Sequence, residues 1–377
     1  MALRRSGTAD LRLHGGYAPQ WLTSRMIRLA RAIFTIMVEE FSISDILARL
    51  SDPFFFQACS NVLGFDWDSS GSTTVTCGVL KNVFCESNLG IKAAGGKGAR
   101  SREALKQIGV EGFKLGLSAE NVESLRYSSR MSAKVDSAAI QDSYQIYHHM
   151  MFFSEGGQWT VVQQGMNADE KTARRYHWLS SRIRSFVEEP HTGIVGEKLH
   201  SSVLDMTAKE SSESRATCVD LSKENPRRVE RLYRSIRHPS QQSLARWVEA
   251  KLGHEYVTHY KATPRRLDWE ALRRTYEFQP SNYEQFLAVK GVGPATVRGL
   301  ALIAELIYGK PPSWRDPVKY SFAFGGKDGV PFPVDRKAMD ESISMLRQSI
   351  EGSKLGGSEK NFALEKLRRY VPADLTS

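Results

Sequence analysis

The sequence has few of the residues that mark secreted or metal-binding proteins, and it has no long apolar run. Only four of its 377 residues are cysteines, with no C-x-x-C pair and no nearby histidine partner: Cys59, Cys77, Cys85 and Cys218. We therefore expect buried thiols in a reducing cytoplasm rather than a zinc site or a disulfide framework. Because no run of about 18 apolar residues occurs, we expect no membrane-spanning helix. The opening stretch MALRRSGTADLRLHGG has no apolar signal core, so we expect a cytoplasmic protein.

Acidic residues are scarce relative to basic ones. The chain carries 52 Lys and Arg against 42 Asp and Glu, a formal net charge of +10. Between Lys223 and Arg274 there are 13 basic residues against six acidic ones. Such a stretch is typical of proteins that displace counterions from a nucleic acid. An anionic membrane surface is the competing partner, but no strongly amphipathic basic helix with an aromatic face supports it.

The most informative segment is YEQFLAVKGVGPATVRGLALIAELIY, residues 283–308. Its pattern predicts an apolar helix, a Gly-Val-Gly turn and a second helix beginning at Pro294, a position whose N–H has no intrahelical partner. Gly291 and Gly293 permit a positive φ and a close approach of ligand to backbone. The N–H groups of the turn would lie beside the positive end of the second helix, which predicts a phosphate site. The alternative is an ordinary helix–turn–helix corner with a glycine cap.

This segment resembles the helix-hairpin-helix motif of DNA repair and recombination proteins, whose hallmark is a hydrophobic-Gly-hydrophobic-Gly turn. The resemblance implies sequence-independent contacts with DNA phosphates. The residues that would make them are Lys290, Gly291, Val292, Gly293, Pro294, Thr296 and Arg298.

A second part of the resemblance concerns Asp335. In base-excision glycosylases with this motif, a Pro-Val-Asp-like ending places a carboxylate at the active site, and Pro333-Val334-Asp335 resembles that ending. Asp335 would then stabilise an oxocarbenium-like sugar, or activate water, on a nucleotide swung out of the duplex. The alternative is that Asp335 only caps the helix that follows.

Two departures from the glycosylase pattern restrict the expected reaction. Asp335 lies 42 positions after Gly293, a longer gap than is usual, and Ala295 stands where bifunctional members place a Schiff-base lysine. We therefore expect a DNA-processing protein, foremost a monofunctional DNA glycosylase of the base-excision type, a DNA-repair hydrolase. A metal-dependent nuclease with its site in the N-terminal domain, or a DNA-binding protein without a reaction, are the alternatives.

The polar segment between Lys134 and Gln164 is the second candidate for chemistry. Asp136, Lys134 and His148 are its candidate acid/base groups, and a carboxylate beside a polar-ended strand is compatible with a nuclease metal site. No E-x-K sequence follows, and adjacent histidines on a helix point about 100° apart, so we assign no metal ligands. A buried hydrogen-bond network explains the same density of polar residues.

Two segments are rich in aromatic residues, one beside arginines and one in the loop expected after the hairpin. In ARRYHWLS, Arg174 and Arg175 adjoin three rings, which suits stacking on bases with phosphate pairing, although a core role for Trp178 explains it nearly as well. After the hairpin, a stacking surface or a plug against the core is expected from Trp314, Tyr320, Phe322 and Phe324.

The expected ligand set is short. DNA, contacted through its phosphate backbone, is the partner; no membrane partner and no specific protein partner is indicated. The reaction requires no cofactor, while a divalent metal ion, or a monovalent cation at the hairpin, is compatible with it.

The expected fold is an α+β or α/β N-terminal domain (1–200), a linker (201–225) and a mainly helical C-terminal domain with the hairpin (226–377). Within it we expect helix over 20–50, a first strand at Thr73–Thr76, a glycine-rich basic loop at GIKAAGGKGARS, and either helix or helix-to-strand structure over 138–153. We also expect a strand at QWTVVQQGM and helices within 226–252, 267–276 and 336–350.

Most of the chain also resembles an uncharacterised, chiefly archaeal family of unknown function. The carrying segments are RRSGTADLRLHGG, DPFFFQACSNVLGFDWDSSG, RMSAKVDSAAIQDSYQIYHH, WTVVQQGMN, ARRYHWLS and GVGPATVRGLALIAELIYG. This resemblance implies family membership but no activity.

Overall fold

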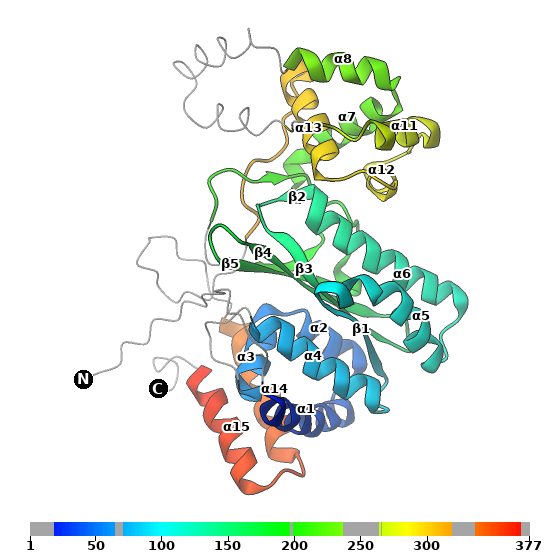
Figure 1. Cartoon of the computed structure of the whole chain (residues 1–377). Helices are drawn as coiled ribbons and strands as arrows, with labels where there is room; N and C mark the ends of the chain where they lie inside the picture. Colours follow the sequence, from blue (N-terminus) through cyan, green and yellow to red (C-terminus); the bar gives the residue numbers. More distant parts are fainter. Residues whose placement is uncertain are drawn as a thin grey trace, which may run out of the picture.

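A five-stranded sheet forms the centre of the molecule (Figure 1). The computed structural model describes residues 19–64, 71–196, 199–236, 264, 266–318 and 336–370. The sheet has the order β1-β3-β4-β5-β6, and its strands are β1 (Ile91–Lys97), β3 (Gln145–Ser154), β4 (Trp159–Asn167), β5 (Thr172–Leu179) and β6 (His191–Val195). Every neighbouring pair in it is antiparallel. The described chain is therefore a mixed α+β protein, and the α/β alternative is wrong.

One face of the sheet is covered by a helical layer built from both ends of the described chain. Its members are α1 (Gln20–Glu40), α2 (Ile43–Leu50), α3 (Pro53–Leu63), α4 (Gly71–Glu86), α14 (Arg336–Gly352) and α15 (Gly357–Tyr370). Apolar side chains of these helices share one core with Met150 and Phe152 of β3. Helices α14 and α15 pack against α1 and α3, below the sheet in Figure 1. The expected C-terminal domain had grouped them with the hairpin instead.

The opposite face of the sheet carries α5 (Ala104–Lys114) and α6 (Ala119–Lys134). A further group of helices packs together above the sheet in Figure 1: α7 (Ser212–Lys223), α8 (Pro226–Ile236), α11 (Trp269–Phe278), α12 (Tyr283–Ala288) and α13 (Pro294–Tyr308). A π-helical turn, η2 (Val135–Ala139), ends α6 and packs against α13. A two-stranded sheet lies alongside, formed by β2 (Ile140–Gln141) and β7 (Leu204–Asp205). One hydrophobic core runs from Met151 and Phe153 on the sheet to Leu300 and Ile303 on α13, so the hairpin helices share their core with the sheet.

Several expected elements are confirmed. Helix covers 20–50 with one break at Phe41 and Ser42, and QWTVVQQGM is strand β4. Residues 138–153 pass from helix to strand, one of the two forms expected for them. Helix α8 lies within its predicted range, and α11 and α14 follow theirs but each ends two residues later. None of the described helices is long and apolar enough to span a membrane.

Two expected elements are wrong, and a third segment, the predicted linker, contains regular secondary structure. Thr73–Thr76 lies in α4 rather than in a strand, because Thr73 and Thr76 are buried and Thr76 Oγ1 lies 3.0 Å from Ser60 Oγ on α3. The glycine-rich segment contains strand β1 in place of a loop. The predicted linker 201–225 contains β7 and α7, tied down by Arg215, which donates to the carbonyls of Met206 (2.9 Å) and Ala208 (2.7 Å).

Gly95 is required by the approach of β1 to β3. Its φ is +111°, and a Cβ there would lie 2.1 Å from the carbonyl oxygen of His149. We expect Gly95→Ala to lower the free energy of unfolding by about 2–4 kcal/mol, measured by urea denaturation. Gly78→Ala is the matched control, because a Cβ at Gly78 of α4 meets nothing within 4 Å and should leave stability unchanged or slightly higher. Equal effects of the two substitutions would contradict this account.

Candidate functional site

The hairpin has the predicted two helices and an exposed turn. Helix α12 ends at Ala288 and α13 begins at Pro294, with Gly291 between them at φ +94°. Lys290, Gly291 and Pro294 are exposed. No side chain caps the N-terminus of α13, which leaves its first N–H groups for solvent or a ligand. A second cation lies beside the turn, because Arg274 Nε donates to the carbonyl of Lys290 (2.8 Å).

Three of the residues expected to contact DNA at the hairpin do not face solvent freely. Val292 and Thr296 are buried, so they pack in the interior and their prediction as DNA contacts is corrected. Arg298 is half-buried: its Nε donates to Gln141 Oε1 (2.8 Å) and its guanidinium lies 5.5 Å from the ring centre of Trp314. Burial lowers the pKa of Arg298. The part of the motif that a phosphate can reach is therefore Lys290, Gly291, Gly293 and Pro294.

Arg174 and Arg175 are fully buried, which corrects their interpretation as DNA contacts. They are neighbours on β5, which has another strand on each side and helical layers on its faces, so their side chains enter opposite faces of the sheet. Arg174 is paired with Asp142 (2.8 Å) and Asp316 (2.8 Å). Arg175 donates to Gln57 of α3 (3.2 Å).

The sheet also separates the expected catalytic residues. His149 bonds to Ser129 of α6, whereas His148 lies on the other face with Met150 and Phe152, because alternate strand residues point to opposite sides. Joint zinc ligation by the two histidines is therefore not possible, for a reason different from the expected helical one. His148 is fully buried, and burial lowers its pKa to about 3.

The remaining catalytic candidates differ in position. Lys134 is the last residue of α6 and is half-buried, and burial lowers its pKa. Asp335 lies outside the described residues. Asp136, in η2, is fully buried on the α6 side of the sheet and is the centre of a hydrogen-bond network.

Asp136 accepts hydrogen bonds from three side chains that are distant in sequence. Its Oδ2 accepts from Gln163 Nε2 (2.5 Å) and Trp178 Nε1 (2.9 Å), and its Oδ1 lies 2.5 Å from His191 Nε2. The indole and amide groups can only donate to it, and the carboxylate orients His191 with Nε2 as the donor. This leaves Nδ1 of His191 as the basic nitrogen of that ring.

The network continues behind Asp136 with defined directions. Gln163 uses its amide N–H for Asp136, so its Oε1 accepts from His149 Nδ1 (2.9 Å). His149 Nε2 then accepts from the hydroxyl of Ser129 (2.8 Å). Burial lowers the pKa of His149, consistent with a neutral ring. Within this network each polar side chain thus has a partner, and the tautomers of His149 and His191 are determined by their neighbours.

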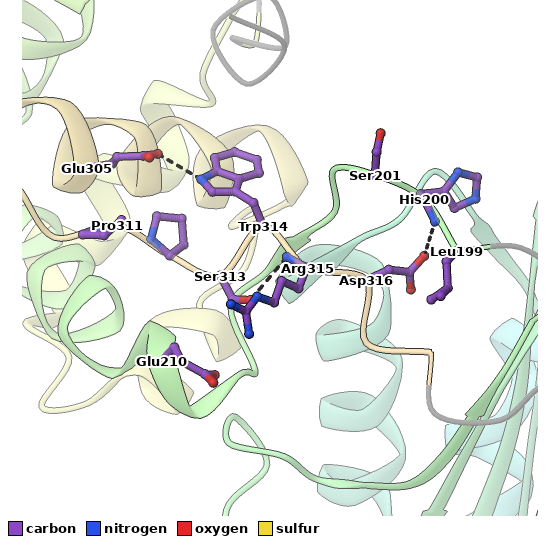
Figure 2. Close-up of a pocket in the computed structure, with 11 residues that line it drawn as sticks. Leu199, His200, Ser201, Glu210, Glu305, Pro311, Ser313, Trp314, Arg315 and Asp316 are labelled. Atoms are coloured by element: carbon purple, nitrogen blue, oxygen red, sulfur yellow. Dashed lines mark hydrogen bonds between the residues drawn. The ribbon is translucent and has the colours of Figure 1, made fainter. Parts of the chain in front are cut away.

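His191 lines a cavity of about 160 Å³ that also contacts Asp205, Glu210 and Asp316. A larger cavity of about 620 Å³ shares Glu210, Ser313, Arg315 and Asp316 with it and is shown in Figure 2. We call the two together the Trp314 cleft, because Trp314 lines the larger one. Burial raises the pKa of Asp205 and of Glu305, two carboxyl groups in the cleft walls.

The connecting segment 309–318, which follows α13, forms one wall of the cleft. Its backbone pairs with β7, since the N–H groups of Val203 and Asp205 donate to the carbonyls of Trp314 (3.0 Å) and Ser313 (2.9 Å). Asp316 anchors the segment to Arg174. Figure 2 shows that Asp316 also accepts from the His200 N–H (2.8 Å) and that Trp314 Nε1 donates to Glu305 (3.1 Å).

Sequence reasoning missed His191, Glu305 and Asp316. His191 follows a proline and begins a five-residue strand, a short pattern that nothing in the sequence links to Asp136, 55 positions earlier. Tyr320, Phe322 and Phe324, expected to join Trp314, lie outside the described residues. Across the described ranges, no group of three or more His, Cys, Asp or Glu residues is placed to hold a metal ion.

Comparison with known proteins gives one finding. Neither the curated proteins nor the solved structures contain a match to the chain. A family model described as "Protein of unknown function (DUF763)" matches residues 7–334. This match covers most of the chain, as the resemblance over the quoted segments had implied, and the protein therefore belongs to the DUF763 family.

Proposed function

We propose that the protein binds DNA through its phosphate backbone at the hairpin turn and hydrolyses N-glycosidic bonds as a monofunctional DNA glycosylase. The observation that carries the DNA-binding part is the exposed turn with Gly291 at φ +94° before the uncapped N-terminus of α13. Backbone N–H groups at such a helix end bind phosphate without reading base sequence. The glycosylase part rests on the resemblance at Pro333-Val334-Asp335.

Electrostatics around the turn supports the same partner. Lys290 is exposed within it, and Arg274 is held beside it by the bond to the Lys290 carbonyl. Helix α8, which packs against α13 and α11, also carries exposed Arg227 and Arg231, four positions apart on one side of the helix. Cations on exposed sites release counterions when a nucleic acid binds.

Lys290→Ala is expected to weaken duplex DNA binding by about 3- to 10-fold at 50 mM salt and to lower the slope of log K against log salt by about one. Fluorescence anisotropy of a labelled duplex across a salt series measures both quantities. Lys106→Ala, an exposed lysine on α5, is the matched control and should behave as wild type. DNA affinity that is absent, or identical in both variants, would contradict the proposal.

The reaction is tested with end-labelled DNA containing uracil, oxidised or alkylated bases, with undamaged duplex, single strand and junctions for comparison. Each sample is incubated with and without Mg²⁺, and half of it is then treated with alkali. Breaks that need alkali and are lost in Asp335→Asn support a monofunctional glycosylase. Direct breaks would indicate a nuclease, and intact DNA with salt-sensitive binding would indicate a binding protein without a reaction.

A further inference from the structure

We infer that the Trp314 cleft receives the nucleoside extruded from bound DNA, and that His191, held by Asp136, activates the water that cleaves it. This inference rests on the proposed function and deepens it. The cleft is the substrate-binding cavity, and His191, 144 positions before Asp335 in the sequence, is a second reacting group.

The cleft is connected to the hairpin turn by direct contacts. The carbonyl of Pro294, the first residue of α13, accepts from Gln141 Nε2 (2.9 Å), and Gln141 Oε1 accepts from Arg298 (2.8 Å). The guanidinium of Arg298 lies over the ring of Trp314, which lines the larger cavity. A DNA strand whose phosphates are bound at the turn is therefore linked to the cleft through only two side chains, Gln141 and Arg298.

The larger cavity has the size and lining for a nucleoside. Its volume of about 620 Å³ is within the range of small-molecule sites. Trp314 offers an aromatic surface for a base, since stacking on such rings stabilises unpaired bases by about 1–3 kcal/mol. Glu305, Glu210 and Ser201 add hydrogen-bonding groups around it.

The acidic lining fits glycosidic cleavage better than phosphodiester cleavage. Glu189, Asp205 and Glu210 border the smaller cavity together with His191, against one cation, Arg315. Asp316 also borders it, but its charge is paired with the buried Arg174. Carboxylates would repel a phosphate that had to react there. They stabilise the positive charge that develops on the sugar when its bond to the base breaks.

In the hydrolysis of the glycosidic bond, His191 alone carries the proton from water to the leaving base. Nδ1 of His191 takes a proton from water, and the water oxygen bonds to C1′ of the deoxyribose. The C1′–N bond breaks, its electron pair leaves with the base, and the imidazolium returns the proton to that base. Asp136 remains a hydrogen-bond acceptor throughout, stabilising the imidazolium through Nε2, as a buried carboxylate does for a catalytic histidine elsewhere.

Base extrusion into the cleft is tested with a duplex in which a 2-aminopurine lies immediately beside a mismatched base, because the fluorescence of the 2-aminopurine rises when that neighbour leaves the stack. Wild type is expected to raise it several-fold at saturating protein, and Trp314→Ala to abolish most of the rise. Trp21→Ala, an exposed tryptophan of α1, is the matched control and should keep it. Ser201→Trp, which fills the cavity from an exposed position, should also abolish the rise without removing a buried contact.

The outcomes separate this inference from the proposed function. Two results would contradict base binding in the Trp314 cleft while leaving DNA binding supported. One is salt-sensitive binding of the duplex by wild type without a rise in fluorescence. The other is a rise in Trp314→Ala and Ser201→Trp as large as in wild type. Absence of DNA binding overturns the proposed function, and the cleft with it. Any change in Lys290→Ala reports on affinity alone and should disappear at saturating protein.

Water activation by His191 has its own test. His191→Asn should slow base release about 100-fold or more under single-turnover conditions while leaving DNA affinity and the 2-aminopurine signal intact. A structural role alone would not separate rate from binding in this way. Base release at the wild-type rate in His191→Asn, or no base release from any DNA whose base is extruded, overturns this part.

Discussion

Arg174→Met is expected to lower the free energy of unfolding by about 3–5 kcal/mol, the usual loss when one partner of a buried ion pair is removed. The guanidinium is fully buried between Asp142 and Asp316, and its Nη1 and Nη2 lie 2.8–3.0 Å from their oxygens. Methionine fills the volume but leaves two carboxylates buried without their cation. Urea denaturation measures the loss.

The same substitution should release the wall of the cleft. Asp316 belongs to the connecting segment 309–318, and its bidentate pairing with Arg174 holds that segment against β5. Limited proteolysis within 309–318 should therefore become faster in Arg174→Met under conditions in which the rest of the protein remains folded.

Arg228→Ala is the control for Arg174→Met. Arg228 also pairs with a carboxylate, Glu224, at 3.0 Å, but both side chains are exposed (52% and 39%). Exposed pairs contribute at most about 1 kcal/mol because water screens them and holding two long side chains costs entropy. Losses of similar size in the two variants would contradict the assignment of Arg174 as a buried, doubly paired cation.

Asp136→Asn is expected to lower the free energy of unfolding by about 3–5 kcal/mol, although the side chain keeps almost the same size and shape. Asp136 accepts from Gln163, Trp178 and His191. Asparagine has one carbonyl oxygen and an NH₂ group, so at least one donor would face another donor in a buried space. The indole N–H resonance of Trp178 should shift strongly in NMR spectra, which locates the defect.

Asp220→Asn provides the comparison for Asp136→Asn. Asp220 lies exposed on α7, and the same chemical change there should alter stability by no more than about 0.5 kcal/mol. Asp136→Asn with wild-type stability would mean that the three donors have other partners.

The sequence was most informative where pattern and local chemistry agree. The hairpin helices, strand β4 and the helices of 20–50 follow from apolar periodicity, glycine and proline. The same reasoning failed at Thr73–Thr76, where β-branched residues favour a strand, but burial against α3 and hydrogen bonding to Ser60 stabilise a helix. It failed at β1 because Gly95 and Gly96 suggest a loop, whereas Gly95 is needed for the close approach of β3.

The candidate site was predicted only in part, and distance in sequence is the reason. Asp136 was identified from its polar surroundings, but its partners Trp178 and His191 lie 42 and 55 positions away. Arg174 and Arg175 carry the composition of a DNA contact, yet their burial depends on which strand lies at the centre of the sheet. No local pattern reports strand order, so the pairing of Arg174 with Asp316, 142 positions later, was beyond reach.

The packing of α14 and α15 against α1 and α3 also determines the order in which the chain can be completed during synthesis. Arg49 of α2 bonds to Glu341 of α14 (2.9 Å), 292 positions later, and Arg28 of α1 pairs with Glu359 of α15, 331 positions later. A ribosome adds about 5–20 residues per second, so the first helices wait on the order of 15 to 60 seconds for their partners. During that interval the apolar side chains of α1 and α3 that later meet α14 and α15 stay uncovered. Helices α1 and α3 are thus synthesised long before α14 and α15, yet reach their final packing only together with them.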